Sequence, residues 1–209
     1  FSRGDQVLVL STGRFGMGWA ESARAMGVEV EVMDFGTRDP VDMARVEARL
    51  RQDSAARIKA VLTTHVDTSS SVLTDIPALR AAMDAAGHPA LLCVDCIASL
   101  GCDEYHMDAW GVDLTVAASQ KGLMTPPGMS FLWFSEKARA AGAQADLRTP
   151  YWDWRARSEP EEFWQYWAGT APTHHLFGLR EALAMLHEEG MPRVWARHEV
   201  LARTVWAAF

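Results

Sequence analysis

Between Gln6 and Phe134, apolar runs of strand length alternate with segments of helical length, and this alternation limits the fold more than any other feature. The runs that we expect to be strands are Gln6–Leu10, Val28–Met33, Ile58–Thr64, Ala90–Val94, Leu114–Ala117 and Met129–Phe134. The segments that we expect to be helices are Trp19–Met26, the stretch from Asp39-Pro40 to Leu50, and Asp75–Ala86. Strands that alternate with helices in this way predict an α/β fold with a doubly wound, mostly parallel sheet.

The character of the chain changes after Ala138. Aromatic residues dominate two stretches, Tyr151–Trp154 and Phe163–Trp167, and two further helices are expected at Thr173–Glu189 and Met191–Phe209. We therefore expect the part of the chain after Ala138 to differ in structure from the alternating part before it. Because the chain opens directly on a strand and closes inside a helical pattern, we expect it to be part of a longer protein.

Composition excludes several classes of partner. The 209 residues carry a net charge of −7 with an isoelectric point near 5.5, which argues against binding to nucleic acid or to an anionic membrane surface. No run is long and apolar enough to span a bilayer, and we find no signal peptide. The three cysteines do not form a disulfide framework, so we predict a cytoplasmic protein.

Polar and loop-forming residues follow most of the expected strands. In an open parallel sheet, ligands bind beyond the carboxyl ends of the strands. The residues found there are Thr12, Gly13, Phe15, Asp34, His65, Asp67, Thr68, Asp95, Ser119, Gln120 and Lys121. An acid, a lysine, hydroxyl groups and an aromatic ring are therefore expected to converge at one edge of the sheet.

Lys121 differs from the other two lysines of the chain. Lys59 begins an expected strand and Lys137 lies in a charged helix start, so both are expected to be solvated. Lys121 stands where a strand ends, in a loop of small and polar residues that closes at Pro126-Pro127-Gly128. A nucleophilic amine needs partial desolvation and an open approach for a carbonyl group. The alternative interpretation is a lysine at a strand end that extends into water.

The first loop suggests a dinucleotide site, but its spacing is wrong. It follows a strand, precedes a helix, and Asp34 ends the next strand. The glycines read Gly13-x-x-Gly16-x-Gly18, whereas a pyrophosphate-binding loop requires Gly-x-Gly-x-x-Gly. A nicotinamide-dependent dehydrogenase that uses this loop remains the less favoured alternative.

The cysteine and histidine pairs do not indicate a metal site. Cys93 and Cys96 have the spacing of a metal knuckle or redox pair, but no second pair exists and Cys102 stands alone. We interpret these cysteines as small buried hydrophobic residues. His174-His175 lies on a helical pattern, where a structural role is favoured over metal ligation.

Asp95 ends an apolar strand, and a carboxylate there is costly to bury unless it meets a cation. One interpretation is that it caps the following turn, Cys96–Ser99. The other is that it is the counter-charge of a buried ring nitrogen. Together with a lysine at the end of the next strand, this second role fits pyridoxal phosphate, whose aldehyde a lysine holds and whose ring nitrogen an aspartate keeps protonated.

The residues that follow Asp95 extend this argument. The segment Val94–Gly101, then Ser119-Gln120-Lys121-Gly122 and Pro126-Pro127-Gly128, resembles the class V, fold type I pyridoxal-phosphate-dependent aminotransferases. The resemblance is greatest to the alanine–glyoxylate and serine–glyoxylate enzymes and covers nearly the whole chain. It implies that residues 1–150 are the cofactor-binding large domain, truncated at both ends. Residues 151–190 would be the aromatic segment and return helix of that domain, and residues 191–209 the start of the connection to a C-terminal small domain.

The resemblance also assigns site residues. Lys121 would be the catalytic lysine that forms the Schiff base with pyridoxal 5′-phosphate, and Asp95 the catalytic partner of the ring nitrogen. Thr170 matches a threonine that reaches the phosphate of the neighbouring subunit, which implies a homodimer with shared active sites. The full set of cofactor-binding residues implied is Phe15, Thr68, Asp95, Ile97, Ser119, Gln120, Lys121 and Thr170.

Some positions depart from the family pattern. The loop that begins His-Gly-Glu in the family reads His65-Val66-Asp67 here, and Trp167 replaces a tyrosine. The phosphate-cradling loop and the arginine that binds the substrate carboxylate are expected before Phe1 and after Phe209. The 209 residues alone are therefore expected to bind the cofactor poorly and to be inactive.

The implied reaction moves an amino group from a small amino acid, such as alanine or serine, to glyoxylate or another small 2-oxo acid. The amino donor stays open, because aspartate and ureidoglycine also fit. Another chemistry on the same scaffold, in a lyase or a desulfurase, is the second alternative. A desulfurase would need a mobile catalytic cysteine, and no loop of the sequence provides one.

Overall fold

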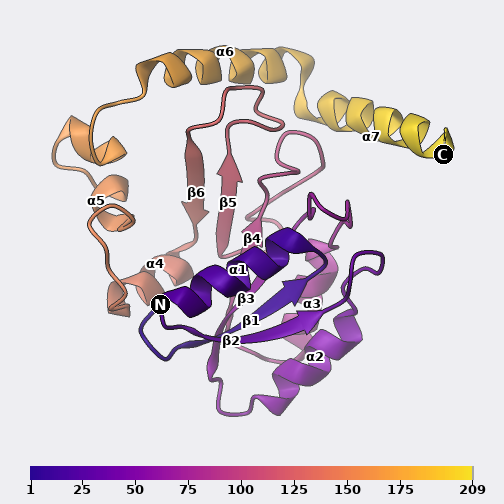
Figure 1. Cartoon of the computed structure of the whole chain (residues 1–209), viewed down its shortest axis with the longest axis vertical. Helices are drawn as coiled ribbons and strands as arrows, with labels where there is room; N and C mark the ends of the chain where they lie inside the picture. The colour runs from indigo at the N-terminus through magenta and orange to yellow at the C-terminus, as the bar shows by residue number, and fades with distance from the viewer. Residues whose placement is uncertain (209) are drawn as a thin grey trace.

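A six-stranded sheet forms the centre of the computed structural model, which describes residues 1–208 (Figure 1). Its strands are β1 (Gln6–Ser11), β2 (Glu29–Asp34), β3 (Ile58–Thr64), β4 (Leu91–Asp95), β5 (Leu114–Ala118) and β6 (Ser130–Phe134). They lie in the order β2-β1-β3-β4-β5-β6, parallel except for β6, which runs antiparallel to β5. The predicted α/β fold with a mostly parallel sheet is confirmed.

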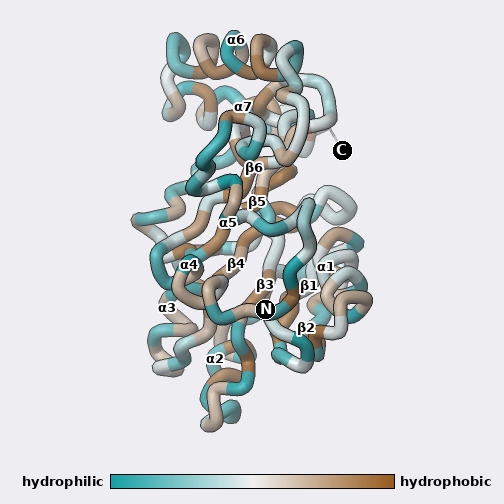
Figure 2. The backbone as a smooth tube through the Cα atoms, turned by 90° about the vertical axis from the view of Figure 1, so that its left-hand side faces the viewer, coloured by the Kyte–Doolittle hydropathy of each residue, from teal (hydrophilic) through white to brown (hydrophobic). Residues whose placement is uncertain are grey.

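Helices complete the layers around this sheet. They are α1 (Arg14–Ala25), α2 (Met43–Gln52), α3 (Ile76–Ala85), α4 (Glu136–Gln144), α5 (Arg155–Ser158), the 3₁₀ helix η1 (Phe163–Trp167), α6 (Thr173–Glu189) and α7 (Met191–Ala207). Figures 1 and 2 both show α6 and α7 at the end of the molecule next to β5 and β6. The hydropathy colouring of Figure 2 also shows that hydrophobic and hydrophilic residues alternate along α6.

Buried side chains of β1 alternate between the two faces of the sheet, as the period of a strand requires. Leu8 and Leu10 join a core that α2 and α3 complete with Val46 and Leu79, among others. Val7 and Val9 join a second core, which α1 covers. Helices on both faces explain why the strand reads as a continuous apolar run and why the sheet is doubly wound.

Two helix starts differ from the sequence prediction. Helix α1 begins at Arg14, so the expected loop before Trp19 is largely the first turns of the helix. Its first N–H groups are bound by a carboxylate from the loop after β3, which no local pattern reveals. Helix α2 begins at Met43 rather than at Asp39-Pro40, because the Asp42 side chain accepts a hydrogen bond from the backbone N–H of Arg45 at 3.1 Å and caps the helix there.

The C-terminal helices follow the prediction closely. Helix α6 has the expected bounds, and α7 runs to Ala207, while the predicted end at Phe209 lies outside the described residues. Within residues 1–208, no helix combines the length and the apolar character needed to cross a membrane. The division of the chain near residues 150 and 190 stays a prediction.

Candidate active site

The predicted site residues gather at the edge where β1, β3, β4 and β5 have their carboxyl ends. Seven of the eight follow one of these strands directly. They are Phe15 after β1, Thr68 after β3, Asp95 and Ile97 at the end of β4, and Ser119, Gln120 and Lys121 after β5. The eighth, Thr170, lies exposed in the link between η1 and α6.

Asp95 is buried at this edge. Its Oδ1 accepts a hydrogen bond from the backbone N–H of Ile97 at 2.7 Å. Burial raises the pKa of the Asp95 carboxyl above its ordinary value; the hydrogen bond from Ile97 and the nearby Trp19 indole oppose this rise, and the nearby charge of Asp67 adds to it. A buried acid in such surroundings favours a cationic partner. Among the described residues, no arginine, lysine or histidine forms an ion pair with it.

Lys121 stands at the start of the loop after β5. The preceding Ser119 is fully buried, and its hydroxyl donates to the carbonyl oxygen of Pro126 at 2.7 Å. The carbonyl oxygen of Ser119 in turn accepts from both the N–H and the hydroxyl of Thr125. These bonds close the loop. Lys121 itself is exposed, so the partial burial expected for its amine is not observed in this structure.

The Lys121 loop packs directly on the turn that follows Asp95. Gly122 approaches the backbone of Leu100 so closely that an added Cβ atom would lie 2.2 Å from its carbonyl oxygen. Gly101 has a φ of 86°, in the left-handed region, and its own Cβ would lie 3.0 Å from the backbone of Gly122. Two glycines therefore allow the Lys121 and Asp95 segments to pack closely. The strands before these segments, β4 and β5, are also paired, with Asp95 opposite Val116.

Gly122→Ala is expected to destabilise the protein by about 1–3 kcal/mol, because the added methyl group must displace a backbone carbonyl. Gly18→Ala is the matched control. Gly18 lies inside α1, and its Cβ would meet only the Arg14 guanidinium at 3.8 Å. This control should gain about 0.5–1 kcal/mol from helix propensity. Chemical denaturation of both variants measures the difference, and equal stabilities would contradict the packing argument.

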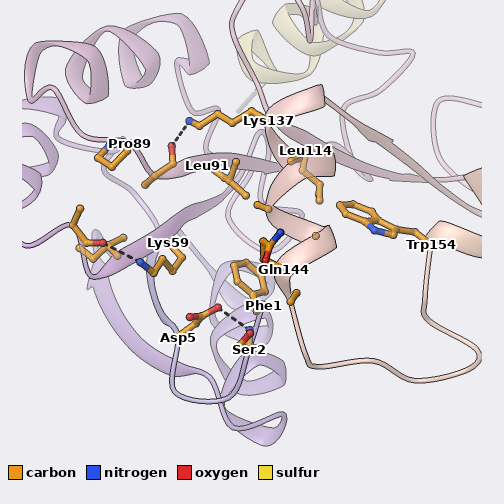
Figure 3. A pocket seen from close by; sticks show the side chains of 17 residues that line it. Phe1, Ser2, Asp5, Lys59, Pro89, Leu91, Leu114, Lys137, Gln144 and Trp154 are labelled. Atoms are coloured by element: carbon orange, nitrogen blue, oxygen red, sulfur yellow. Dashed lines mark hydrogen bonds between the residues drawn. The ribbon is translucent and has the colours of Figure 1, made fainter.

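The other two lysines lie at the opposite edge of the sheet. Both line a pocket of about 470 Å³ beside Leu91 and Leu114, at the amino-terminal ends of β4 and β5 (Figure 3). The Lys59 ammonium donates to the carbonyl oxygen of Ala56 at 3.3 Å. The Lys137 ammonium donates to that of Ala90 at 2.9 Å. Of the three lysines, only Lys121 shares an edge with Asp95.

The start of α1 argues against a dinucleotide site. The Asp67 carboxylate is fully buried there, and its Oδ2 accepts the N–H groups of Phe15 and Gly16, each at 2.9 Å. A pyrophosphate at a helix N-terminus needs such donors and is repelled by a carboxylate. A nicotinamide dinucleotide would therefore find neither free N–H donors nor a favourable electrostatic field at the start of α1.

Two of the three cysteines are buried as predicted, and the third is only partly buried. Cys93 and Cys96 are buried, and burial raises the pKa of each thiol to about 12. Cys102 is partly buried, and burial raises the pKa of its thiol as well. Because the thiolate is the reactive form, these three thiols are unsuited to act as the nucleophile of a desulfurase.

Two histidines serve the architecture of this edge. His65 is buried with its Nδ1 2.9 Å from the Ser99 hydroxyl, and burial lowers the pKa of its ring to about 4, so the ring is neutral near pH 7. Its backbone N–H donates to the carbonyl oxygen of Asp95 at 2.8 Å. His175 has its Nε2 3.1 Å from the carbonyl oxygen of Pro127. The structural role predicted for the His174-His175 pair fits this contact.

Trp19 and Asp67 are the residues to which the sequence argument gave no role. Trp19 lies one helical turn after Phe15, on the same face of α1, and its indole interacts with the Asp95 carboxyl. This spacing of four residues was visible in the sequence. However, the sequence prediction placed the start of the helix at Trp19 instead of Arg14, so Phe15 and Trp19 were not expected to share a face.

Comparison with known proteins identifies the family. The model of the class V aminotransferase family matches residues 1–208. The chain is 41% identical over 207 residues to a serine–glyoxylate aminotransferase of Methylorubrum extorquens, with 96% of this chain and 51% of that protein covered. It is 38% identical to an L-aspartate–glyoxylate aminotransferase of Paracoccus denitrificans, with 99% and 52% covered.

A solved structure agrees with the sequence relatives. The alanine–glyoxylate aminotransferase of Nostoc sp. superposes with a TM-score of 0.88 at 27% identity, over 99% of this chain and 54% of that one. The chain thus spans about half the length of the relatives it matches. By fold and by sequence, this chain belongs to the class V aminotransferase family.

Proposed function

We propose that the protein is a pyridoxal-phosphate-dependent aminotransferase that moves an amino group from a small amino acid to glyoxylate or another small 2-oxo acid. Family membership and the names of the similar proteins support this reaction. Those proteins use serine, aspartate or alanine with glyoxylate, by their names, so these three amino acids are the first donors to test here.

The chemistry of the sheet edge fits the cofactor. Asp95 is a buried carboxyl that lacks a cationic partner among residues 1–208, and burial raises its pKa. The protonated nitrogen of a pyridine ring would supply that positive charge. When bound, pyridoxal phosphate contributes an aldehyde that accepts an amine and a ring that withdraws electrons from the substrate carbon.

Each residue has a proposed task. The amine of Lys121 would hold the cofactor covalently, and it would carry the proton removed from the α-carbon of the substrate. Asp95 holds the proton on the ring nitrogen. Phe15 and Ile97 would lie against the ring, and Thr68 would lie near its phenolic oxygen. Ser119 and Gln120 are proposed to approach the phosphate; Gln120 is exposed, whereas the hydroxyl of Ser119 already donates to Pro126.

One observation carries this proposal: Lys121 and Asp95 follow neighbouring strands at the same edge, and their loops are in backbone contact through Gly122 and Leu100. Lys59 and Lys137 lie at the other edge. A lyase or desulfurase on the same scaffold is the second candidate. It is disfavoured here because the thiols of this chain are buried and their pKa values are raised.

We also propose that the protein acts as a homodimer in which Thr170 reaches the phosphate in the partner's site. Large aromatic residues precede Thr170 in the chain and are open to solvent, with exposed fractions of 74% for Trp152, 70% for Phe163 and 57% for Trp164. Exposed aromatic groups of this size support a protein interface. Sedimentation equilibrium of the intact protein measures the number of subunits. A cytoplasmic location stays a prediction.

A panel of half-reactions tests the proposed function. The intact protein, loaded with pyridoxal phosphate, is mixed with alanine, serine, aspartate or ureidoglycine in turn, and the yellow absorbance of the cofactor is followed. At least one donor is expected to remove this absorbance at a useful rate, and glyoxylate is expected to restore it. A cofactor that stays unchanged with every donor would contradict aminotransfer. Release of sulfide when free cysteine is added in place of these donors would contradict it too.

A further inference from the structure

The Asp67 carboxylate occupies an unusual place, fully buried at the start of α1 and bonded on both oxygens. Oδ2 accepts the backbone N–H groups of Phe15 and Gly16, each at 2.9 Å. Oδ1 accepts the N–H of Ser69 at 3.0 Å and its hydroxyl at 2.7 Å. The hydroxyl oxygen of Ser69 accepts the N–H of Arg14 at 2.8 Å. We call Asp67 and Ser69 the α1 clamp.

The clamp replaces a cap that the helix lacks. The residue before α1 is Gly13, which has no side chain to bind the first N–H groups. Gly13 also lies so close to the clamp that an added Cβ would be 2.5 Å from the Ser69 hydroxyl and 2.6 Å from the Asp67 carboxyl carbon. The first turn of α1 is therefore fixed from outside the helix, by a loop 52 residues further along the chain.

The clamped turn carries Phe15 at the edge of the site. Its side chain is 49% exposed, although its backbone N–H is bound to Asp67. Four residues later Trp19 lies on the same face of the helix and interacts with the Asp95 carboxyl. The position of Phe15 at this edge of the sheet thus depends on where the clamp sets the helix start.

The negative charge of Asp67 also favours a cation at the Asp95 edge. Burial works to raise the pKa of Asp67, but hydrogen bonds from Gly16, Ser69 and Phe15 outweigh it, so the pKa lies below its ordinary value and the group is ionised at neutral pH. This negative charge helps to raise the pKa of Asp95. The ionised Asp67 and the raised pKa of Asp95 both favour a cationic ring nitrogen at this edge.

We propose that Asp67 is a positioning residue of the active site, which fixes the first turn of α1 and thereby holds the Phe15 ring against the bound cofactor. This inference rests on the proposed function, because it concerns the same cofactor. Asp67 itself does not touch the reacting atoms in this role; it acts through Phe15.

A double-mutant cycle on cofactor binding tests this role. The intact protein, Asp67→Asn, Phe15→Leu and the double variant are titrated with pyridoxal phosphate by absorbance, and the melting temperature of each cofactor-free form is recorded. Asp67→Asn is expected to weaken binding by about three- to tenfold, the range of a lost aromatic contact. In the Phe15→Leu background the same change is expected to cost less, because the ring that Asp67 positions is already gone and only the loss of its charge remains.

The circular dichroism of the bound cofactor, measured at saturation, adds a readout that a loss of stability alone would not move. It is expected to fall in Asp67→Asn, because the ring is held less firmly. Asp34→Asn is the matched control. Asp34 ends the neighbouring strand β2 and accepts the N–H of Gly36 at 2.9 Å, but it is exposed and should leave the dissociation constant unchanged in both backgrounds.

If Asp67→Asn yields no folded protein, the same double-mutant cycle is made with Ser69→Ala. This change removes the hydroxyl that donates to Asp67 and accepts the N–H of Arg14, but it leaves the Asp67 carboxylate in place. An equal loss of affinity in both backgrounds, or an unchanged affinity, overturns the role of Asp67 while the proposed function stands. A parent protein that binds no pyridoxal phosphate overturns both. The two failures are therefore distinguishable.

Discussion

Replacing Lys121 with alanine is expected to abolish covalent attachment of pyridoxal phosphate and to lower the rate of aminotransfer by about 10⁴-fold or more, since general acid–base catalysis and the covalent link are lost together. Lys121 is the lysine at the edge of the sheet that Asp95 shares. Its side chain is exposed, so its loss should leave the fold intact. Borohydride reduction followed by peptide mass spectrometry locates the attachment, and stopped-flow absorbance measures the rate.

The other lysines provide the controls for this experiment. Lys59→Ala should change neither attachment nor rate, because its ammonium donates only to the carbonyl oxygen of Ala56 in a surface turn. Lys137→Ala should lower stability without affecting attachment. Its ammonium donates to the carbonyl oxygen of Ala90 and lies 3.4 Å from the buried carboxylate of Asp113. A reduced cofactor found on Lys59 or Lys137 in the unmodified protein would refute the assignment of Lys121.

Asp95→Asn is expected to retain the fold and bind the cofactor, yet to lower aminotransfer on the order of 10³-fold, comparable to the loss of a preorganised electrostatic group. The backbone N–H of Ile97 donates to Oδ1 of Asp95 at 2.7 Å, and the amide oxygen of asparagine is able to accept the same bond. However, the amide carries no charge with which to keep the ring nitrogen protonated. The measurements are the melting temperature, the cofactor dissociation constant and the single-turnover rate with an active donor.

Asp34→Asn is the matched control for Asp95→Asn as well. Both carboxylates end a strand and accept the N–H of the residue two positions further on, from Gly36 and from Ile97. Only Asp95 is buried at the edge that Lys121 shares. If Asp95→Asn kept near-normal turnover, the carboxylate would be only a turn cap, which is the structural interpretation that its sequence context also allows.

The sequence by itself determined the layers of the molecule and the edge at which the site lies. Apolar runs in alternation with helical segments encode a parallel sheet, and the residues after each strand must then meet at one edge. Lys121 and Asp95 were predicted to share this edge in this way, as the structure shows, and helix α6 was predicted with its observed bounds. These signals are local: a strand repeats every two residues and a helix every 3.6, so a single segment carries them.

Only the tertiary structure decided how the site is held together. The start of α1 depends on Asp67, which is 52 residues away, and the contact of Gly122 with Leu100 spans two loops. No periodic pattern links such residues. Their contact exists because the sheet brings separate strand ends together, and because a buried carboxylate and unpaired helix N–H groups must each find a partner once water is excluded.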